Sequence, residues 1–341
     1  MNPQYSEIAY LDSLYDKTGQ AYAFRATNRS EWAAWRREFR EKLIEILGGF
    51  PASKVPLEPV MLERVEEECY WREKIAFNTE EGLSVPAYVL VPKNGKPPFP
   101  AVIAQHGHGR GKDDSAGVVQ ARHQAYNMRA LHYTYGRDLA CQGYLVVVPD
   151  ARLFGDRSDT RVGGNWGTCH HGAAMSLLYG KTVMGGRVWD IIRTIDYLET
   201  RPDALPGRVG CLGLSGGGMI TLYSAAIDDR ITASVISGYL CTFRGSIMEV
   251  GHCLCNYVPG ILKYGEMYDI AALIAPKPLF IEAGTRDPIF PVEAVQEAYK
   301  KLRRAYELVG APESLDIHIF DGQHEWRGER SYPWLDAHLK L

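Results

Sequence analysis

From residue 70 onward, short apolar runs alternate with helical patterns, and this alternation limits the possible folds more than any other feature of the sequence. It is typical of a mostly parallel sheet covered by helices on both faces, so an α/β fold is predicted. We expect a leading hairpin and later strands at residues 70–77, 85–91, 101–105, 144–149, 209–214, 231–237, 278–283 and 315–320. Helices are expected at residues 125–141, 187–200, 216–227 and 292–306, and a last helix, kinked at Pro333, from about 326 to 339.

The first 69 residues have a different pattern. Ser30 is expected to cap a helix that Gly48 and Gly49 end. Its apolar stripe recurs at helical spacing and consists of Trp32, Trp35, Phe39, Leu43, Ile46 and Leu47. We therefore predict an N-terminal helical extension over residues 1–69, packed on a main domain over residues 70–341.

The composition excludes several classes of partner. The chain has 341 residues, and its 46% hydrophobic content is enough for a sizeable core. A net charge of -3 provides no basic field for nucleic acid. No segment approaches the roughly 20 apolar residues that span a bilayer, and residues 1–30 hold no apolar signal-peptide core. We expect a cytoplasmic protein without nucleic-acid or membrane partners.

The seven cysteines are an odd number and lie mostly within apolar segments. This favours reduced, buried thiols over a disulfide framework. His252, Cys253 and Cys255 stand close together and carry the imidazole and sulfur ligands that suit zinc. Because no second Cys or His pair has zinc-site spacing, we expect these residues to line a pocket or the core, and we expect no metal site.

Residues 213–217 read Gly-Leu-Ser-Gly-Gly and stand between an expected strand and an expected helix. A serine hydroxyl attacks a carbonyl carbon well only when a base removes its proton, so it must be exposed on a sharp turn beside that base. Gly213 and Gly217 allow strand and helix to approach closely enough for this turn. Ser215 is therefore a candidate nucleophile, although a glycine-rich turn without catalytic function fits the same residues.

An acid and a histidine base follow the last two expected strands. Asp287 follows the seventh strand and His324 the eighth. Parallel strands bring their carboxyl ends to one edge, and the chain order Ser, Asp, His is that of a triad on such a sheet. We predict a catalytic triad of Ser215, Asp287 and His324. Asp321 is the rival acid, but its closeness to His324 in sequence makes the far imidazole nitrogen awkward to reach.

Acyl transfer also needs backbone donors for the oxyanion. One candidate is the amide of Gly216, at the N-terminus of the helix that follows the nucleophile. The second is the amide of His108, in the His-Gly-His-Gly turn at residues 106–109, with Gly107 as the fallback. A nucleotide-phosphate loop is the competing interpretation, but residues 107–112 lack the Gly-Lys-Ser/Thr ending.

Two connections exceed ordinary loop lengths, at residues 152–186 and 240–275. Both leave from carboxyl strand ends, where ligands bind in open α/β sheets. We expect the second connection to form a wall of the substrate pocket. The predicted substrate-binding residues are Gly107, His252, Cys253 and Tyr257.

Arg152 and Arg157 open the first of these connections. Either cation is able to meet an anionic substrate. Two acids stand beside them in the sequence, so we expect structural ion pairs with Asp150 or Asp156 instead.

In chain order, the turn at 106–109, the Ser215 elbow, Asp287 and His324 resemble the α/β-hydrolase superfamily over about residues 70–341. Two further segments are similar to its bacterial branch related to acetyl xylan esterases and dienelactone hydrolases. They are Pro-Asp-Ala-Arg-Leu-Phe-Gly-Asp-Arg at residues 149–157 and His-Cys-Leu-Cys-Asn-Tyr-Val-Pro-Gly at 252–260, the latter leading into Ile-Ala-Pro-Lys-Pro at 274–278.

The chain also departs from these relatives. The family that deacetylates xylan and cephalosporin shares an ending similar to His324-Glu325, but it has a glutamine after its serine and an upstream Arg-Gly-Gln motif. Here Gly216 follows Ser215, and no Arg-Gly-Gln occurs. Dienelactone hydrolases proper use a cysteine nucleophile. The resemblance therefore supports the class and leaves the substrate open.

The predicted triad implies a serine carboxylic-ester hydrolase that forms an acyl-enzyme and needs no cofactor. The resemblance alone implies short-chain acyl esters, such as acetylated carbohydrates. Alternatives are a serine peptidase and a lactone or dienelactone-type hydrolase. A catalytically silent binding protein is a third, but packing does not require Ser, Asp and His together. The expected partner is a small-molecule ester, and a homo-oligomer is compatible with each function.

Overall fold

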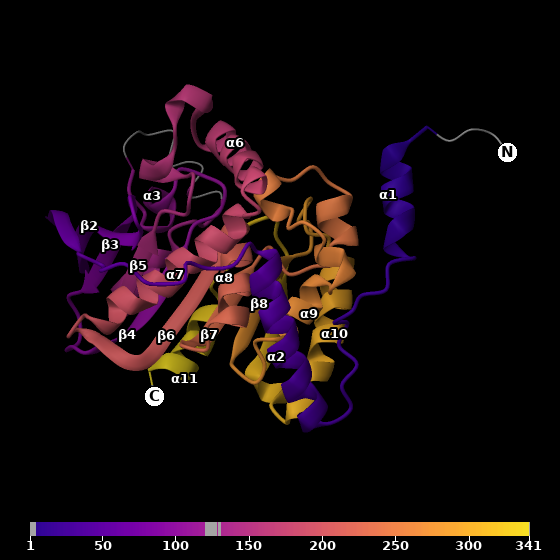
Figure 1. Ribbon diagram of the computed structural model, residues 1–341. Helices are drawn as coiled ribbons and strands as arrows, with labels where there is room; N and C mark the ends of the chain where they lie inside the picture. Colours follow the sequence, from indigo (N-terminus) through magenta and orange to yellow (C-terminus); the bar gives the residue numbers. More distant parts are fainter. Residues whose placement is uncertain (1–4, 120–127, 129–130, 341) are drawn as a thin grey trace.

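The protein is built around one nine-stranded sheet (Figure 1). The structure is a computed structural model that describes residues 5–119, 128 and 131–340. Its strands are β1 (Val60–Glu66), β2 (Tyr70–Glu80), β3 (Leu83–Pro92), β4 (Phe99–Gln105), β5 (Leu145–Pro149), β6 (Ala204–Leu214), β7 (Ile231–Ser237), β8 (Leu279–Gly284) and β9 (Leu315–Phe320). They lie in the order β1-β2-β3-β5-β4-β6-β7-β8-β9. The pairs from β1 through β3 to β5 are antiparallel, and those from β5 to β9 are parallel. The carboxyl ends of β4, β6, β8 and β9 therefore meet at one edge.

Helices cover both faces of this sheet. The described helices are α1 (Glu7–Tyr15), α2 (Arg29–Ile46), α3 (Lys112–Ser115), α5 (Tyr135–Cys141), α6 (Gly164–Leu178), α7 (Val183–Glu199), α8 (Gly216–Ile227), α9 (Met267–Ala272), α10 (Val292–Val309) and α11 (Ser331–Leu339). One core lies between the sheet and α2, α7, α8, α9 and α10, and the other lies under α5 and α11. In β5, Leu145 and Val147 join the first core, whereas Val146 and Val148 join the second. This alternation explains why a strand buried on both faces is apolar throughout.

The eight expected strands are confirmed within a few residues, and the expected α/β-hydrolase architecture is present. The strand β1 was not predicted, because it is an exposed edge strand that pairs with β2 and lacks an apolar alternation. Part of the helix expected at 125–141 falls at 125–127 and 129–130, outside the described residues, and α5 begins only at Tyr135. The last helix begins at Ser331, so Pro333 sits in its first turn, where no amide partner is lost and no kink is needed.

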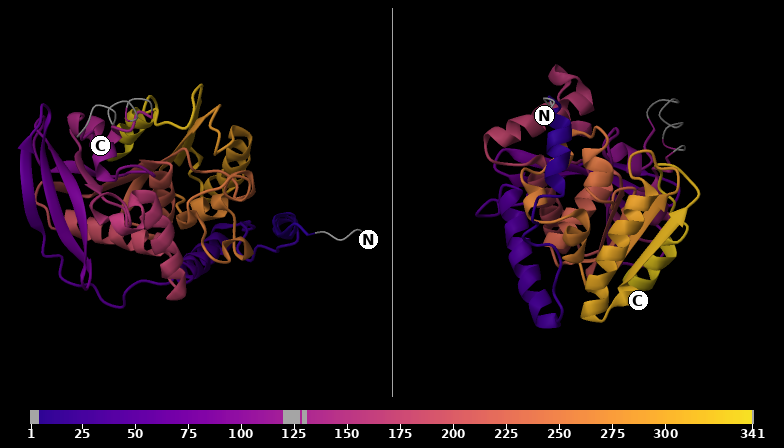
Figure 2. Two further views of the ribbon diagram at one scale, coloured as in Figure 1. Left: turned by 90° about the horizontal axis from the view of Figure 1, so that it is seen from above. Right: turned by 90° about the vertical axis from the view of Figure 1, so that its right-hand side faces the viewer.

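The N-terminal helix α2 is part of the first core. Phe39, Leu43 and Leu47 are fully buried there. Asn28, rather than the expected Ser30, caps the helix by accepting a hydrogen bond from the Glu31 amide. α1 lies at the periphery of the molecule and buries no side chain (Figure 2). The division of the chain at residues 69 and 70 stays a prediction.

The expectation that all cysteines are reduced is wrong at one pair. Cys69, just before β2, and Cys141, at the end of α5, form a disulfide with their Cα atoms 5.2 Å apart. Both residues lie beside the segment that follows β3, where the Lys93 amide donates to the Cys69 carbonyl and the Asn94 side chain donates to the Cys141 carbonyl. The two cysteines are 72 positions apart and carry no local signal for this pairing, because strand order in the sheet brings them together. The other five cysteines are free and buried.

The two long connections contain helices of their own. Residues 152–186 include α6, which stands at the top of the molecule in Figure 1, and residues 240–275 include α9 and several short turns of helix. Both connections come over the carboxyl edge of the sheet. Within the described residues, no helix combines the length and apolar character needed to cross a membrane.

Candidate active site

Ser215 occupies the sharp turn between β6 and α8. Its backbone has φ 59° and ψ -119°, a conformation that residues with a Cβ rarely adopt. Its amide donates a hydrogen bond to the Ser237 carbonyl at 2.9 Å. A Cβ on Gly213 or on Gly217 would lie only 2.5 or 2.1 Å from the Gln105 carbonyl oxygen. Both glycines of the motif are therefore needed because the elbow is pressed against the end of β4.

Asp287 and His324 are in contact. His324 Nδ1 lies 2.7 Å from Asp287 Oδ2, and the Asp287 side chain is almost completely buried. The other carboxylate oxygen accepts the amides of Ile289 and Phe290, each at 3.0 Å, which fixes the orientation of the acid. The rival acid, Asp321, instead forms an exposed ion pair with an arginine at 2.7 Å. Asp287, and not Asp321, is thus the carboxylate in contact with the His324 imidazole.

His324 lies at the same edge of the sheet as Ser215. A Cβ on Gly238, directly after β7, would lie 3.2 Å from His324 Nδ1 and 3.0 Å from the Leu214 side chain. The buried Glu282 of β8 fixes the loop after His324. Its carboxylate accepts hydrogen bonds from two amides of that loop and from the Ser331 hydroxyl. The histidine therefore has a fixed place next to the β6 elbow.

The turn at residues 106–109 also packs against the elbow. A Cβ on Gly107 would lie 3.3 Å from Ser215 Cβ, and one on Gly216 would lie 2.8 Å from His108 Nδ1. The Tyr133 hydroxyl fills the remaining space beside Gly107. The two residues predicted to donate to the oxyanion, His108 and Gly216, are consequently neighbours at the elbow.

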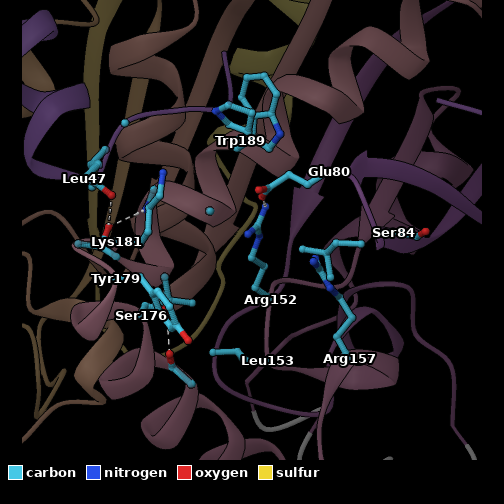
Figure 3. A pocket seen from close by; sticks show the side chains of 18 residues that line it. Leu47, Glu80, Ser84, Arg152, Leu153, Arg157, Ser176, Tyr179, Lys181 and Trp189 are labelled. Carbon is cyan, nitrogen blue, oxygen red and sulfur yellow. Dashed lines mark hydrogen bonds and ion pairs between the residues drawn. The ribbon is translucent and has the colours of Figure 1, made fainter. Parts of the chain in front are cut away.

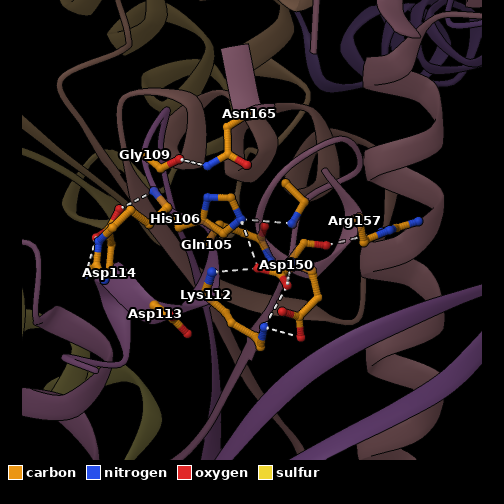
Figure 4. Close-up of polar contacts among 12 residues, drawn as sticks. Gln105, His106, Gly109, Lys112, Asp113, Asp114, Asp150, Arg157 and Asn165 are labelled. Atoms are coloured by element: carbon orange, nitrogen blue, oxygen red, sulfur yellow. Dashed lines mark hydrogen bonds and ion pairs between the residues drawn. The ribbon is translucent and has the colours of Figure 1, made fainter. Parts of the chain in front are cut away.

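A buried polar network supports this turn (Figure 4). His106 Nε2 accepts the Ala151 amide at 2.9 Å, which leaves Nδ1 to donate to the Gly107 carbonyl at 2.7 Å. Burial lowers the pKa of His106, and the nearby Asp150 carboxylate opposes that shift. The neutral ring therefore joins the end of β4 to the end of β5.

Lys112 and Asp150 form a second buried link below the turn (Figure 4). Asp150 Oδ2 lies 2.8 Å from Lys112 Nζ, and Oδ1 accepts the Lys112 amide at 2.7 Å. Burial alone would lower the pKa of Lys112, but Asp150 and then Asp156 raise it above its usual value. From the other side, the Asn165 side chain of α6 donates to the Gly109 carbonyl at 2.8 Å.

Of the predicted substrate-binding residues, His252 comes near the triad. Its ring packs on Phe290 at 5.5 Å, and Phe290 in turn stacks on His324 at 5.7 Å. Its Nε2 is 3.0 Å from the Ser246 hydroxyl. Burial, followed by the charges of His108 and His324, lowers the pKa of His252.

Tyr257 lines a different cavity. This cavity has a volume of about 340 Å³ and lies between α1 and the connection at 240–275. The Tyr257 hydroxyl donates to the Ile247 carbonyl at 3.2 Å. No triad residue is among those that line it, so the structure gives Tyr257 no contact with the proposed chemistry.

Arg152 and Arg157 form structural ion pairs, as expected, but with a different acid. Both contact Asp190 of α7, at 2.9 and 2.6 Å, and Arg152 also pairs with Glu80. Asp150 and Asp156 instead form ion pairs with Lys112. The two arginines line a cavity of about 670 Å³ between α6, α7 and the end of α2, and the triad is not among its lining residues (Figure 3).

The structure also gathers a group of potential metal ligands that the sequence keeps apart. The ring of His108 and the sulfur atoms of Cys169, Cys253 and Cys255 all lie within 4.8 Å of one another. Hydrogen bonds from Cys253 and Cys255 lower the pKa of the Cys169 thiol. Cys253, predicted to line the substrate pocket, therefore faces another cysteine.

The model of the Abhydrolase family matches residues 5–331. The curated protein "Putative hydrolase YtaP" of Bacillus subtilis (strain 168) is 30% identical over 295 residues, which cover 83% of this chain and 91% of that protein. The chain belongs to the Abhydrolase family. The enzyme class is thereby hydrolase, and the resemblance drawn from the sequence is confirmed.

Solved structures agree with this assignment at the level of the fold. A "putative acetyl xylan esterase (BF1801)" from Bacteroides fragilis NCTC 9343 superposes with a TM-score of 0.84, at 20% identity, covering 99% of this chain and 96% of the other. A glucuronoyl esterase from Solibacter usitatus superposes with a TM-score of 0.68, at 16% identity, covering 98% and 97%. The coverage includes the N-terminal segment, so the folds correspond over nearly the whole chain.

Proposed function

We propose that this α/β-hydrolase is a serine carboxylic-ester hydrolase in which Ser215 is the nucleophile, His324 the base and Asp287 the orienting acid. One arrangement carries the proposal: a 2.7 Å contact between His324 Nδ1 and Asp287 Oδ2 beside a serine with φ 59°. A strained serine elbow next to an acid-oriented histidine is the arrangement that activates a hydroxyl for acyl transfer.

In the proposed reaction, Ser215 Oγ attacks the ester carbonyl carbon while His324 Nε2 takes its proton. Asp287 keeps the other ring nitrogen protonated and stabilises the imidazolium. The amides of Gly216 and His108 bind the oxyanion of the tetrahedral intermediate. The intermediate expels the alcohol, which takes the proton back from His324. Water then attacks the acyl-enzyme by the same route, releasing the acid and free Ser215.

Two observations support short acyl esters of carbohydrates as substrates. Fold relatives include a protein described as a "putative acetyl xylan esterase". In addition, the indole of Trp166 on α6 is 58% exposed and stacks on the His108 ring at 5.1 Å. A flat apolar face of this kind beside the oxyanion turn is suited to packing against a sugar ring. A small-molecule ester as partner, the possible homo-oligomer and the cytoplasmic location stay predictions.

The test is to label the full chain with a fluorophosphonate, locate the adduct by peptide mass spectrometry and measure p-nitrophenyl acetate hydrolysis. We expect the adduct on Ser215 and a loss of at least about 10³-fold in kcat/KM for Ser215→Ala. Ser224→Ala is the matched control, because among the described residues the hydroxyl of this buried serine of α8 has no hydrogen-bond partner. Equal hydrolysis by wild type and Ser215→Ala would contradict the proposal.

A substrate panel then separates the alternatives. Acetylated sugars, aryl acetates, lactones and short peptides are compared by kcat/KM on the same preparation. The proposal requires acetylated sugars to rank first. Preference for a peptide would replace the ester assignment, and preference for a lactone would replace the acylated carbohydrate as substrate; either result would keep the triad.

A further inference from the structure

The four potential ligands come from three separate segments. His108 belongs to the turn after β4, Cys169 to α6, and Cys253 and Cys255 to the connection at 240–275. Cys169 and Cys253 have their sulfur atoms 3.2 Å apart, and His108 Nε2 is 3.1 Å from Cys255 Sγ. The three cysteines are buried, and no step of the proposed ester hydrolysis uses their sulfur atoms.

The spacing of these atoms fits one tetrahedral cation. Zinc binds thiolate sulfur at about 2.3 Å and imidazole nitrogen at about 2.0–2.1 Å, so neighbouring ligand atoms lie about 3.5–3.8 Å apart. The observed separations run from 3.1 Å to at most 4.8 Å. Movements of less than about 1 Å would bring all four onto one ion, and Cys₃His is a common ligand set of closed structural zinc sites.

A buried arginine provides independent support. Arg187 of α7 is 2% exposed, and its guanidinium lies 3.3 Å from Cys169 Sγ. The guanidinium also interacts with Cys255, the Arg152 carbonyl at 3.0 Å and the Phe154 ring at 5.4 Å, and within the described residues its Nε has no hydrogen-bond partner. Within the described part of the chain, no carboxylate forms an ion pair with it. A buried cation requires a negative partner, and thiolates are the groups in reach.

We propose that His108, Cys169, Cys253 and Cys255 bind one zinc ion in a closed tetrahedral site. On binding, three thiols release their protons to solvent, and His108 binds through Nε2 as the neutral imidazole. Three thiolates around a divalent cation leave one negative charge, which Arg187 balances. The site replaces the sequence-based expectation of no metal, because tertiary structure supplies the second pair of ligands.

The ion would hold both long connections onto the turn that carries His108. Coordination at Nε2 leaves the proton on Nδ1, the ring nitrogen that faces Gly216. It also fixes the residue whose amide is proposed to bind the oxyanion. The zinc ion would thus be structural and would position part of the active site. Metal binding itself does not depend on the proposed esterase activity.

Metal content tests the proposal directly. The full, untagged chain is purified with a phosphine reductant, passed through metal-free buffer and measured by inductively coupled plasma mass spectrometry. We expect about one zinc per chain, falling to less than about 0.2 in Cys169→Ser, Cys253→Ser and Cys255→Ser. Cys211→Ser is the matched control and should keep its zinc. Cys211 is equally buried but lies outside the cluster, and Thr221 Oγ1 lies 3.6 Å from its sulfur.

Cobalt gives a second readout that needs no variant. The reduced, metal-free wild type should develop visible bands of tetrahedral cobalt and a near-ultraviolet thiolate charge-transfer band when Co²⁺ is added. The proposal is overturned if the purified chain contains no zinc and the cobalt bands do not appear. It is also overturned by zinc that persists in all three cysteine variants, or by a metal-free chain with a Cys169–Cys253 disulfide. Ser215→Ala should keep full zinc while losing hydrolysis, which separates this proposal from the function.

Discussion

At the scale of single residues, the backbone of Ser215 is the point of greatest local cost. A φ of 59° with ψ -119° is a conformation that a residue with a Cβ pays for with about 1–3 kcal/mol. The surrounding contacts keep it there: the Ser215 amide bonds to Ser237, and the helix that follows begins at once with Gly216. The strain holds the hydroxyl out of the helix, where a nucleophile has to be.

This strain predicts that glycine at position 215 leaves the protein more stable than alanine does. Ser215→Gly should unfold at a higher urea concentration than Ser215→Ala, because glycine adopts this conformation without a Cβ clash. The expected difference in the free energy of unfolding is about 1 kcal/mol. Part of the gain is offset by the larger entropy of the unfolded glycine chain. Both variants should be inactive. A Ser215→Gly protein less stable than Ser215→Ala would show that the elbow is unstrained.

At the scale of elements, the site depends on how neighbouring strand ends are joined. β4 and β5 run in parallel, and their carboxyl ends are tied by His106, which accepts the Ala151 amide, and by the buried pair of Lys112 and Asp150. The sequence located the strands correctly because each is a short apolar run. It gave no indication of these ties, because a polar side chain in a turn carries no periodic signal.

The tie through His106 predicts an acid-dependent loss of stability. Burial lowers the pKa of His106 in the folded protein below the ordinary value of 6.5. Below pH 6.5 the unfolded chain therefore binds a proton at this residue that the folded chain does not. The contribution of His106 to stability is fully present above pH 6.5 and is lost as the pH falls below it. The slope due to this residue approaches about 1.4 kcal/mol per pH unit.

Urea unfolding of wild type and His106→Gln from pH 8 to pH 5 measures this contribution. The glutamine keeps an acceptor for the Ala151 amide but does not titrate. We expect the variant to be less stable at pH 8 and to lose less stability on acidification than the wild type. Other histidines titrate equally in both proteins, so identical pH slopes would assign the acid sensitivity to them.

At the scale of the whole molecule, the N-terminal segment is joined to the hydrolase fold by its core. Leu43 of α2 is fully buried with residues of α8 and α10 in one apolar cluster. On the same helix, Arg36 and Arg40 both pair with Asp229, between α8 and β7. The apolar stripe in the sequence predicted the burial of α2, but the strand β1 that follows it was missed, because its side chains are mostly exposed.

This packing predicts that the chain unfolds as one unit. Leu43→Ala should lower the free energy of unfolding by about 2–5 kcal/mol, the usual cost of a cavity left by a buried leucine. The transition should stay single by circular dichroism and by tryptophan fluorescence. Ile8→Ala, on the exposed α1, is the control and should change little. A separate early transition in Leu43→Ala would mean that the extension folds independently.

The sequence by itself determined eight of the nine strands, the chain order of Ser215, Asp287 and His324, and the glycines of the elbow, because hydrophobic periodicity and turn chemistry are local properties. Tertiary structure decided which groups meet across the chain: Asp190 as the partner of Arg152 and Arg157, the disulfide of Cys69 and Cys141, and the gathering of His108 with three cysteines. Such pairings depend on strand order and on how the long connections return over the sheet, and no spacing along the chain encodes them.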